Sequence, residues 1–94
     1  MKRMWISNFK REVEKNLKGT IIVEIESSLL LSGFELEIVK IIIHNECFNH
    51  PFIHNIGTVE NVMSFDPIDV AQSFIRFYKG IISNKFFKEI IDNN

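Results

Sequence analysis

The 94-residue sequence predicts an α+β domain in two layers, with an N-terminal and a C-terminal helix on one face of a three-stranded antiparallel sheet. Three observations predict this class. Apolar residues recur with helical spacing near both ends, two segments rich in Ile, Val and Leu flank a short turn, and a helix start signal lies near residue 66. At this length we expect one domain, residues 1–94.

The first expected element is a helix over residues 4–18. Phe9, Val13 and Leu17 recur every four residues and form one apolar stripe, while charged side chains take the other faces. Gly19 is suited to ending the helix, because glycine tolerates the left-handed backbone of a helix terminus.

A β-hairpin is expected next, with strands over residues 20–31 and 34–43. Ser32-Gly33 between them suits a two-residue turn, and that turn fixes which residues lie opposite each other. Since side chains alternate between the two faces of a sheet, this register places four carboxylates on one face. They belong to Glu24, Glu26, Glu35 and Glu37.

The far end of the second strand departs from this alternation. Val39, Ile41 and Ile43 would share the face of the acids. Either that end is covered on both faces, or a bulge near Lys40 turns these side chains inward.

The remaining elements are a third strand and a second helix. We expect the strand over residues 57–65, after a polar connection over 44–55. Asp66 is suited to capping the helix, with Pro67 at its first position. Gly80 interrupts the helical spacing, so we expect a short extra helix that restarts at Ser83 or Asn84.

The acids are concentrated in the middle of the chain. Residues 20–70 hold eight acids and one base, whereas both flanks are basic and the net charge is −1. A near-neutral chain is not typical of a general nucleic-acid binder. Four carboxylates on one face could instead occupy a basic, phosphate-binding groove of a protein partner. The alternative is a solubilising face that keeps the sheet from pairing edge to edge.

The histidines and the single cysteine are the candidate metal ligands. His44, Cys47, His50 and His54 fall within eleven residues, and imidazole and thiolate are preferred zinc ligands. The spacing fits poorly, because zinc sites usually bring two close ligand pairs together across a longer loop. A polar loop with solvated histidines is the alternative, so we expect no cofactor and keep a zinc-binding module as the second hypothesis.

Aromatic residues near both ends are expected to form core. Phe74, Phe77 and Tyr78, with Trp5 and Phe9, could stack on bases, but their helical spacing favours packing. The C-terminal apolar side chains, if exposed, would make a homodimer or partner contact. These are Phe86, Phe87, Ile90 and Ile91.

Signatures of catalysis and of membrane insertion are missing from the sequence. It holds no G-x-S-x-G, Walker loop, H-E-x-x-H or glycine-rich nucleotide loop, so we expect no enzyme. Its apolar runs are too short to span a bilayer, and one cysteine suits a reducing compartment. We therefore expect a cytoplasmic protein with no membrane contact.

Three parts of the chain carry a resemblance to a known family. The Phe9–Leu17 helix, the Glu24/Glu26 and Glu35/Glu37 strands and the run Ile68–Gly80 resemble, in element order and charge placement, small anti-CRISPR proteins of the type II-A class. These come from low-GC bacteria and their prophages. The resemblance implies a phage-encoded stoichiometric inhibitor that blocks the DNA-recognition groove of a CRISPR effector nuclease by mimicking DNA charge. Apart from the zinc module, the other alternative is a homo-oligomeric structural or regulatory phage protein.

Overall fold

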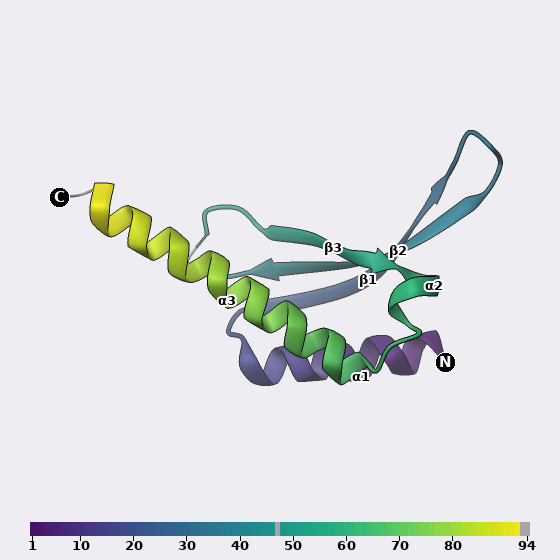
Figure 1. Cartoon of the computed structure of the whole chain (residues 1–94), viewed down its shortest axis with the longest axis horizontal. Helices are drawn as coiled ribbons and strands as arrows, with labels where there is room; N and C mark the ends of the chain where they lie inside the picture. Colours follow the sequence, from purple (N-terminus) through teal and green to yellow (C-terminus); the bar gives the residue numbers. More distant parts are fainter. Residues whose placement is uncertain (47, 93–94) are drawn as a thin grey trace.

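The architecture is a three-stranded antiparallel sheet with helices on one face, in the strand order β1-β2-β3 (Figure 1). The computed structural model describes residues 1–46 and 48–92, with side chains up to residue 84. The predicted α+β class is confirmed. In chain order the elements are α1 (Lys2–Asn16), β1 (Thr20–Leu29), β2 (Glu35–His44), β3 (Phe52–Thr58), α2 (Val59–Val62) and α3 (Pro67–Asp92).

Between β1 and β2, Leu30 and Phe34 still pair with each other, which leaves a loop of three residues, 31–33. The Leu30 amide donates to the Phe34 carbonyl at 2.8 Å, and the Gly33 amide donates to the Leu30 carbonyl at 2.9 Å. Gly33 has a φ of 88°, in the left-handed region that glycine adopts without a steric penalty. The expected two-residue turn is therefore wrong. The pairing of the strands is shifted by one residue, so that Glu37 lies opposite Ser27.

This shift places the odd-numbered residues of both strands beneath the helices. Val39, Ile41 and Ile43 are fully buried there, which removes the irregularity expected from the sequence. A bulge does occur between Val39 and Lys40, but only in the pairing of β2 with β3, where it leaves Ile56 without an opposite residue. The β1–β2 pairing continues past it without interruption.

The helix α1 packs on the sheet and on α3 through its aromatic stripe. The rings of Trp5 and Phe9 stack with centroids 5.3 Å apart, and Trp5 Nε1 donates to the Phe65 carbonyl at 2.9 Å. Tyr78 of α3 is fully buried, and its hydroxyl accepts a hydrogen bond from Asn45 Nδ2 at 3.3 Å. The Trp5 hydrogen bond joins α1 to the segment before α3, and the Tyr78 hydrogen bond joins α3 to the segment after β2.

The third strand and the segment after it differ from the expectation. The strand covers residues 52–58, and the valines expected to continue it lie in α2 instead. Val59 and Val62 are three residues apart, so both face the core from one helical turn. The Thr58 hydroxyl accepts from the Asn61 amide at 3.3 Å and caps this turn.

The C-terminal helix begins as expected and does not stop at Gly80. The Asp66 carboxylate accepts from the Ile68 amide at 2.8 Å, which confirms the predicted cap. The helix then continues to Asp92, so a separate helix restarting near Ser83 is wrong. One glycine weakens a helix but does not break it. Within the described residues, none of the helices is long and apolar enough to cross a membrane.

A substitution at Gly80 tests the continuity of α3. Apart from its chain neighbours and the backbone of the helix itself, no atom of the described side chains and backbone lies within 4 Å of an added Cβ there. We expect Gly80→Ala to raise the free energy of unfolding by about 0.5–1 kcal/mol in urea denaturation, because alanine loses less backbone entropy in a helix. Gly19→Ala is the control with the opposite sign, since Gly19 has a φ of 117° and an added Cβ would collide with the His44 carbonyl. Destabilisation by Gly80→Ala would contradict a continuous helix.

Candidate interaction surface

The hairpin formed by β1 and β2 extends beyond the rest of the sheet. The last residue of β3, Thr58, pairs with Ile38. Residues 27–29 and 35–37 therefore pair only with each other and project from one corner of the molecule (Figure 1). We call residues 27–37 the hairpin arm.

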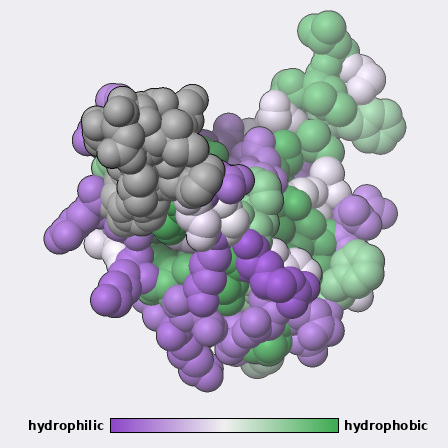
Figure 2. Space-filling model, turned by 60° about the vertical axis from the view of Figure 1, so that its left-hand side comes forward, coloured by the Kyte–Doolittle hydropathy of each residue, from purple (hydrophilic) through white to green (hydrophobic). Residues whose placement is uncertain are grey.

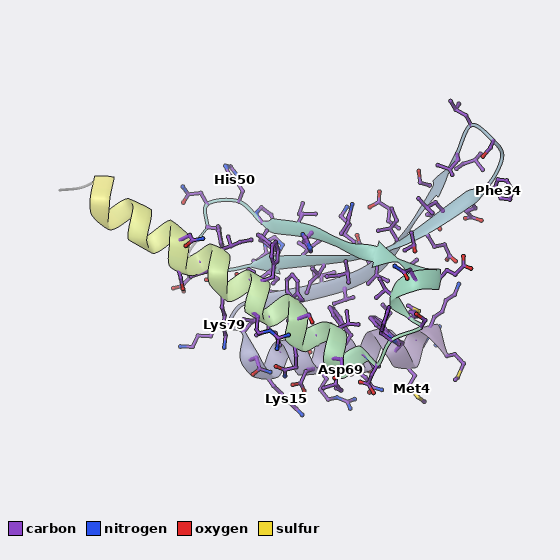
Figure 3. The ribbon with its side chains drawn as sticks, in the orientation of Figure 1. Met4, Lys15, Phe34, His50, Asp69 and Lys79 are labelled. Carbon is purple, nitrogen blue, oxygen red and sulfur yellow. The ribbon has the colours of Figure 1, made fainter. Side chains whose placement is uncertain are left out.

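The end of this arm is apolar and exposed. Leu31 and Phe34 are 110% and 72% exposed, and Leu29 and Leu30 are 77% and 44% exposed. We call these four side chains the hairpin tip. They form the apolar knob at the upper right of Figure 2, and Figure 3 shows Phe34 at the end of the arm. Burying one such side chain contributes about 1.5–3 kcal/mol, so a contiguous exposed group of four indicates a contact surface.

The hairpin tip was not predicted as a site from the sequence. The run Leu29-Leu30-Leu31 was assigned to the end of a strand, where apolar residues are ordinary. The signal that could have found it is the position of this run beside Ser32-Gly33. Hairpin turns normally carry polar residues, and three leucines entering one are unusual.

The four predicted acids do not share a face. Because the pairing is shifted by one residue, Glu24 and Glu26 lie on the open face with Lys40. Glu35 and Glu37 lie on the opposite face, on the side of α1. The expected single acidic face is therefore wrong, and the carboxylates instead lie on both sides of the hairpin.

Two of the acids are paired with lysines of the chain itself. Lys40 Nζ contacts Glu26 Oε2 at 2.8 Å, and Lys2 Nζ contacts Glu37 Oε1 at 2.9 Å. The pKa of Lys40 is raised above its usual value, because Glu26 accepts its hydrogen bond and attracts its charge, with a smaller attraction from Glu24. Within the described part of the chain, Glu24 and Glu35 have no ion pair.

His44 and His50 line one hollow, but His54 lies apart from them on the other face of the sheet. His44 lies on the open face, opposite Thr20, and is exposed. His54 lies on the helix side, with its ring 4.9 Å from the centroid of Phe77 and 5.8 Å from that of Phe74. The described residues contain no group of three potential metal ligands, and Cys47 lies outside them. The geometry thus gives no support to the zinc-binding alternative.

The aromatic residues lie mainly in the core, as expected. Phe9 and Tyr78 are fully buried, and Trp5 and Phe74 are nearly so. Phe77 is the exception, with 47% of its surface exposed. The side chains of the predicted C-terminal contact, from Phe86 to Ile91, lie outside the described ones.

The open face of the sheet carries a row of isoleucines. This row was not predicted from the sequence. Ile22 lies opposite Ile42, which lies opposite Ile53, so the row crosses all three strands. Ile22 and Ile53 are 38% and 56% exposed. The row follows from the same one-residue shift that separates the acids.

Comparison of the chain with protein-family models, with curated proteins and with solved structures finds no match in any of the three.

Paired cysteines test the register on which this surface depends. We expect Ser27→Cys with Glu37→Cys to form a disulfide in a Cys47→Ser background, because these positions are directly opposite. Counting from the Leu30–Phe34 hydrogen bond, they form a non-hydrogen-bonded pair, whose Cα atoms are about 4.5 Å apart. The matched control is Ser28→Cys with Glu37→Cys, whose side chains would point to opposite faces. Oxidation measured by thiol titration should favour the first pair, and the reverse preference would contradict the register.

Proposed function

We propose that this chain is a binding protein that docks on another protein by inserting the hairpin tip into an apolar recess. The observation that carries the proposal is the exposure of four contiguous large apolar side chains on a projecting arm. Nothing about the proposal requires catalysis by the chain. Binding would bury surface that folding leaves in water, which is the main source of favourable free energy in protein association.

The arm is suited to entering a recess because it is ordered before binding. The strand pairing continues to Leu29 and Glu35, and two backbone hydrogen bonds close the loop beyond them. A preformed hairpin loses less conformational entropy on binding than a flexible loop does. Its leucine and phenylalanine side chains can therefore act as anchors in a partner pocket.

Charge on the arm favours a protein with a basic rim over a membrane. The arm itself carries Glu35 and Glu37 and no basic residue. Anionic lipid surfaces attract basic segments, so they would repel this one. A second copy of the arm would bring like charges together as well. Lysine and arginine side chains around an apolar pocket would instead complement Glu35, which has no ion pair among the described residues.

The inhibitor suggested by the anti-CRISPR resemblance is a narrower form of this function. In that form the basic rim belongs to a nucleic-acid groove of an effector nuclease, and the acidic arm competes with phosphates for it. The exposed Glu35 carboxylate, which has no ion pair among the described residues, supports this version. It no longer relies on a single acidic face.

A charge introduced at the tip tests the binding function. We expect Leu31→Asp to weaken partner capture from a phage-host bacterial lysate by about ten-fold or more, since a charge cannot enter an apolar pocket without losing hydration. Met4→Asp is the matched control, because Met4 is a 65% exposed apolar side chain on α1 (Figure 3). Quantitative mass spectrometry compares the captured proteins. Equal loss with both variants, or no loss with Leu31→Asp, would contradict the proposal.

The inhibitor form has its own test. We expect the chain, in molar excess, to reduce DNA cleavage by a type II-A effector nuclease, and we expect Glu35→Lys to weaken this inhibition most at low salt. Cleavage is measured by gel electrophoresis over a series of salt concentrations. Full cleavage in the presence of excess protein would rule out this effector class as the target, while the binding function would still be decided by the Leu31→Asp comparison.

A further inference from the structure

A groove runs between β3, α2 and α3, away from the hairpin tip. It consists of two hollows of about 290 and 240 Å³, and both are lined by Ile56, Val70 and Ser73. Because the hollows share these three residues, they lie next to each other along α3, and we treat them as one groove. Phe65 and Asp69 lie at one end, and His54 and Phe77 lie at the other. We call it the β3–α3 groove.

The walls of the groove leave apolar surface in water. Phe65 is 60% exposed and Phe77 is 47% exposed, one at each end, while Ile56 and Val70 are half-buried along the length. The groove thus has an apolar floor bounded by two aromatic side chains. Grooves of this kind bind ligands through apolar contacts and use a few polar groups to fix orientation.

The strand that borders the groove is an edge strand. β3 pairs with β2 on one side and, in the part of the chain that the structure describes, with no strand on the other. Residues 52–55 pair with β2 without irregularity, so every second residue turns its N–H and C=O groups away from the sheet. Among the described residues, no hydrogen bond engages these outward groups. A free strand edge beside an apolar groove can accept a further strand.

We propose that the β3–α3 groove binds an extended peptide segment of another protein, which pairs with β3 and places alternate apolar side chains in the groove. The backbone hydrogen bonds would come from residues 52–55, and the pockets for side chains would lie between Ile56, Val70 and Phe77. This proposal is independent of the hairpin tip, because it uses other elements of the fold.

Two charged side chains of α3 indicate which charges the bound peptide carries. Arg76 donates a hydrogen bond to the Ser73 hydroxyl at 3.5 Å, which places its guanidinium beside the middle of the groove. Neither Arg76 nor Asp69 has an ion pair within the described residues. The bound segment therefore carries a carboxylate that meets Arg76 and a basic side chain that meets Asp69. Arginine is well suited to this role because its guanidinium binds a carboxylate through two parallel hydrogen bonds.

Selection from a displayed library of random octapeptides tests the proposal. We expect the enriched sequences to carry apolar residues at alternate positions, an acidic residue near the middle and a basic residue near one end. The enriched peptide is then synthesised with a fluorescent label, and its affinity is measured by fluorescence anisotropy.

Ser73→Tyr should weaken binding by about ten-fold or more, because the ring would fill the centre of the groove from an exposed position. Ser83→Tyr, exposed on α3 but outside the lining of the groove, is the matched control and should leave affinity unchanged.

Backbone methylation distinguishes strand pairing from simple apolar binding. One set of alternate peptide amides would face β3 and the other set would face water. N-methylation of the first set should abolish binding, whereas N-methylation of the second set should be tolerated. Arg76→Glu should weaken binding of the acidic peptide. The same variant should bind a peptide in which lysine replaces the acidic residue that meets position 76.

Four results would overturn the proposal. In the first, the library yields no enriched peptide. In the second and third, Ser73→Tyr binds the peptide as well as the parent does, or both methylation patterns are tolerated equally. In the fourth, light scattering shows a dimer that Ser73→Tyr dissociates. The last result would show that a second copy occupies the edge of β3. Circular dichroism of each variant confirms that the fold is retained before affinities are compared.

Discussion

The left-handed backbone of Gly33 is the constraint on which the rest of the structure depends. With φ at 88°, it closes a three-residue loop and fixes how β1 lies against β2. A slip of one residue along β2 would turn Val39, Ile41 and Ile43 toward water and bring Lys40 and Ile42 beneath the helices. Each apolar inversion of this kind costs roughly 1.5–3 kcal/mol. The loop and the core therefore specify the same register.

The same register decides what the surface can offer a partner. It separates the acids of β1 from those of β2, so that neither face of the sheet carries all four. It also lets Lys40 reach Glu26 and Lys2 reach Glu37, which neutralises one acid on each side. Exposed apolar side chains remain at the hairpin tip and along the isoleucine row, beside the carboxylates of Glu24 and Glu35, which have no ion pair among the described residues. The surface therefore favours apolar contact with local acidic guidance over broad charge mimicry.

Much of the fold could be predicted from the sequence, because helices and strands follow from the periodicity of apolar residues. The interaction surface could not be predicted, because it depends on the register in which β1 pairs with β2. The stripe through Phe9 and Val13 and the cap at Asp66 are local signals, and both were confirmed. Ser32-Gly33, however, suits a two-residue and a three-residue loop equally well, since both place a glycine in the left-handed region. Val59 and Val62 suit a strand or a helical turn. In each case tertiary packing decides between two locally acceptable structures.

The energetics of the hairpin tip explain why acidic residues flank it. Four large apolar side chains could contribute roughly 6–12 kcal/mol on full burial. Association of two proteins costs about 4–15 kcal/mol in lost freedom of motion, so the tip alone comes close to balancing that cost. Charge attraction at the rim mainly raises the rate of encounter and excludes partners of the wrong sign. Glu35, which has no ion pair among the described residues, also opposes the pairing of two arms, which would otherwise be the easiest way to bury the leucines. An apolar tip with an acidic residue beside it therefore selects a basic-rimmed recess over another copy of itself.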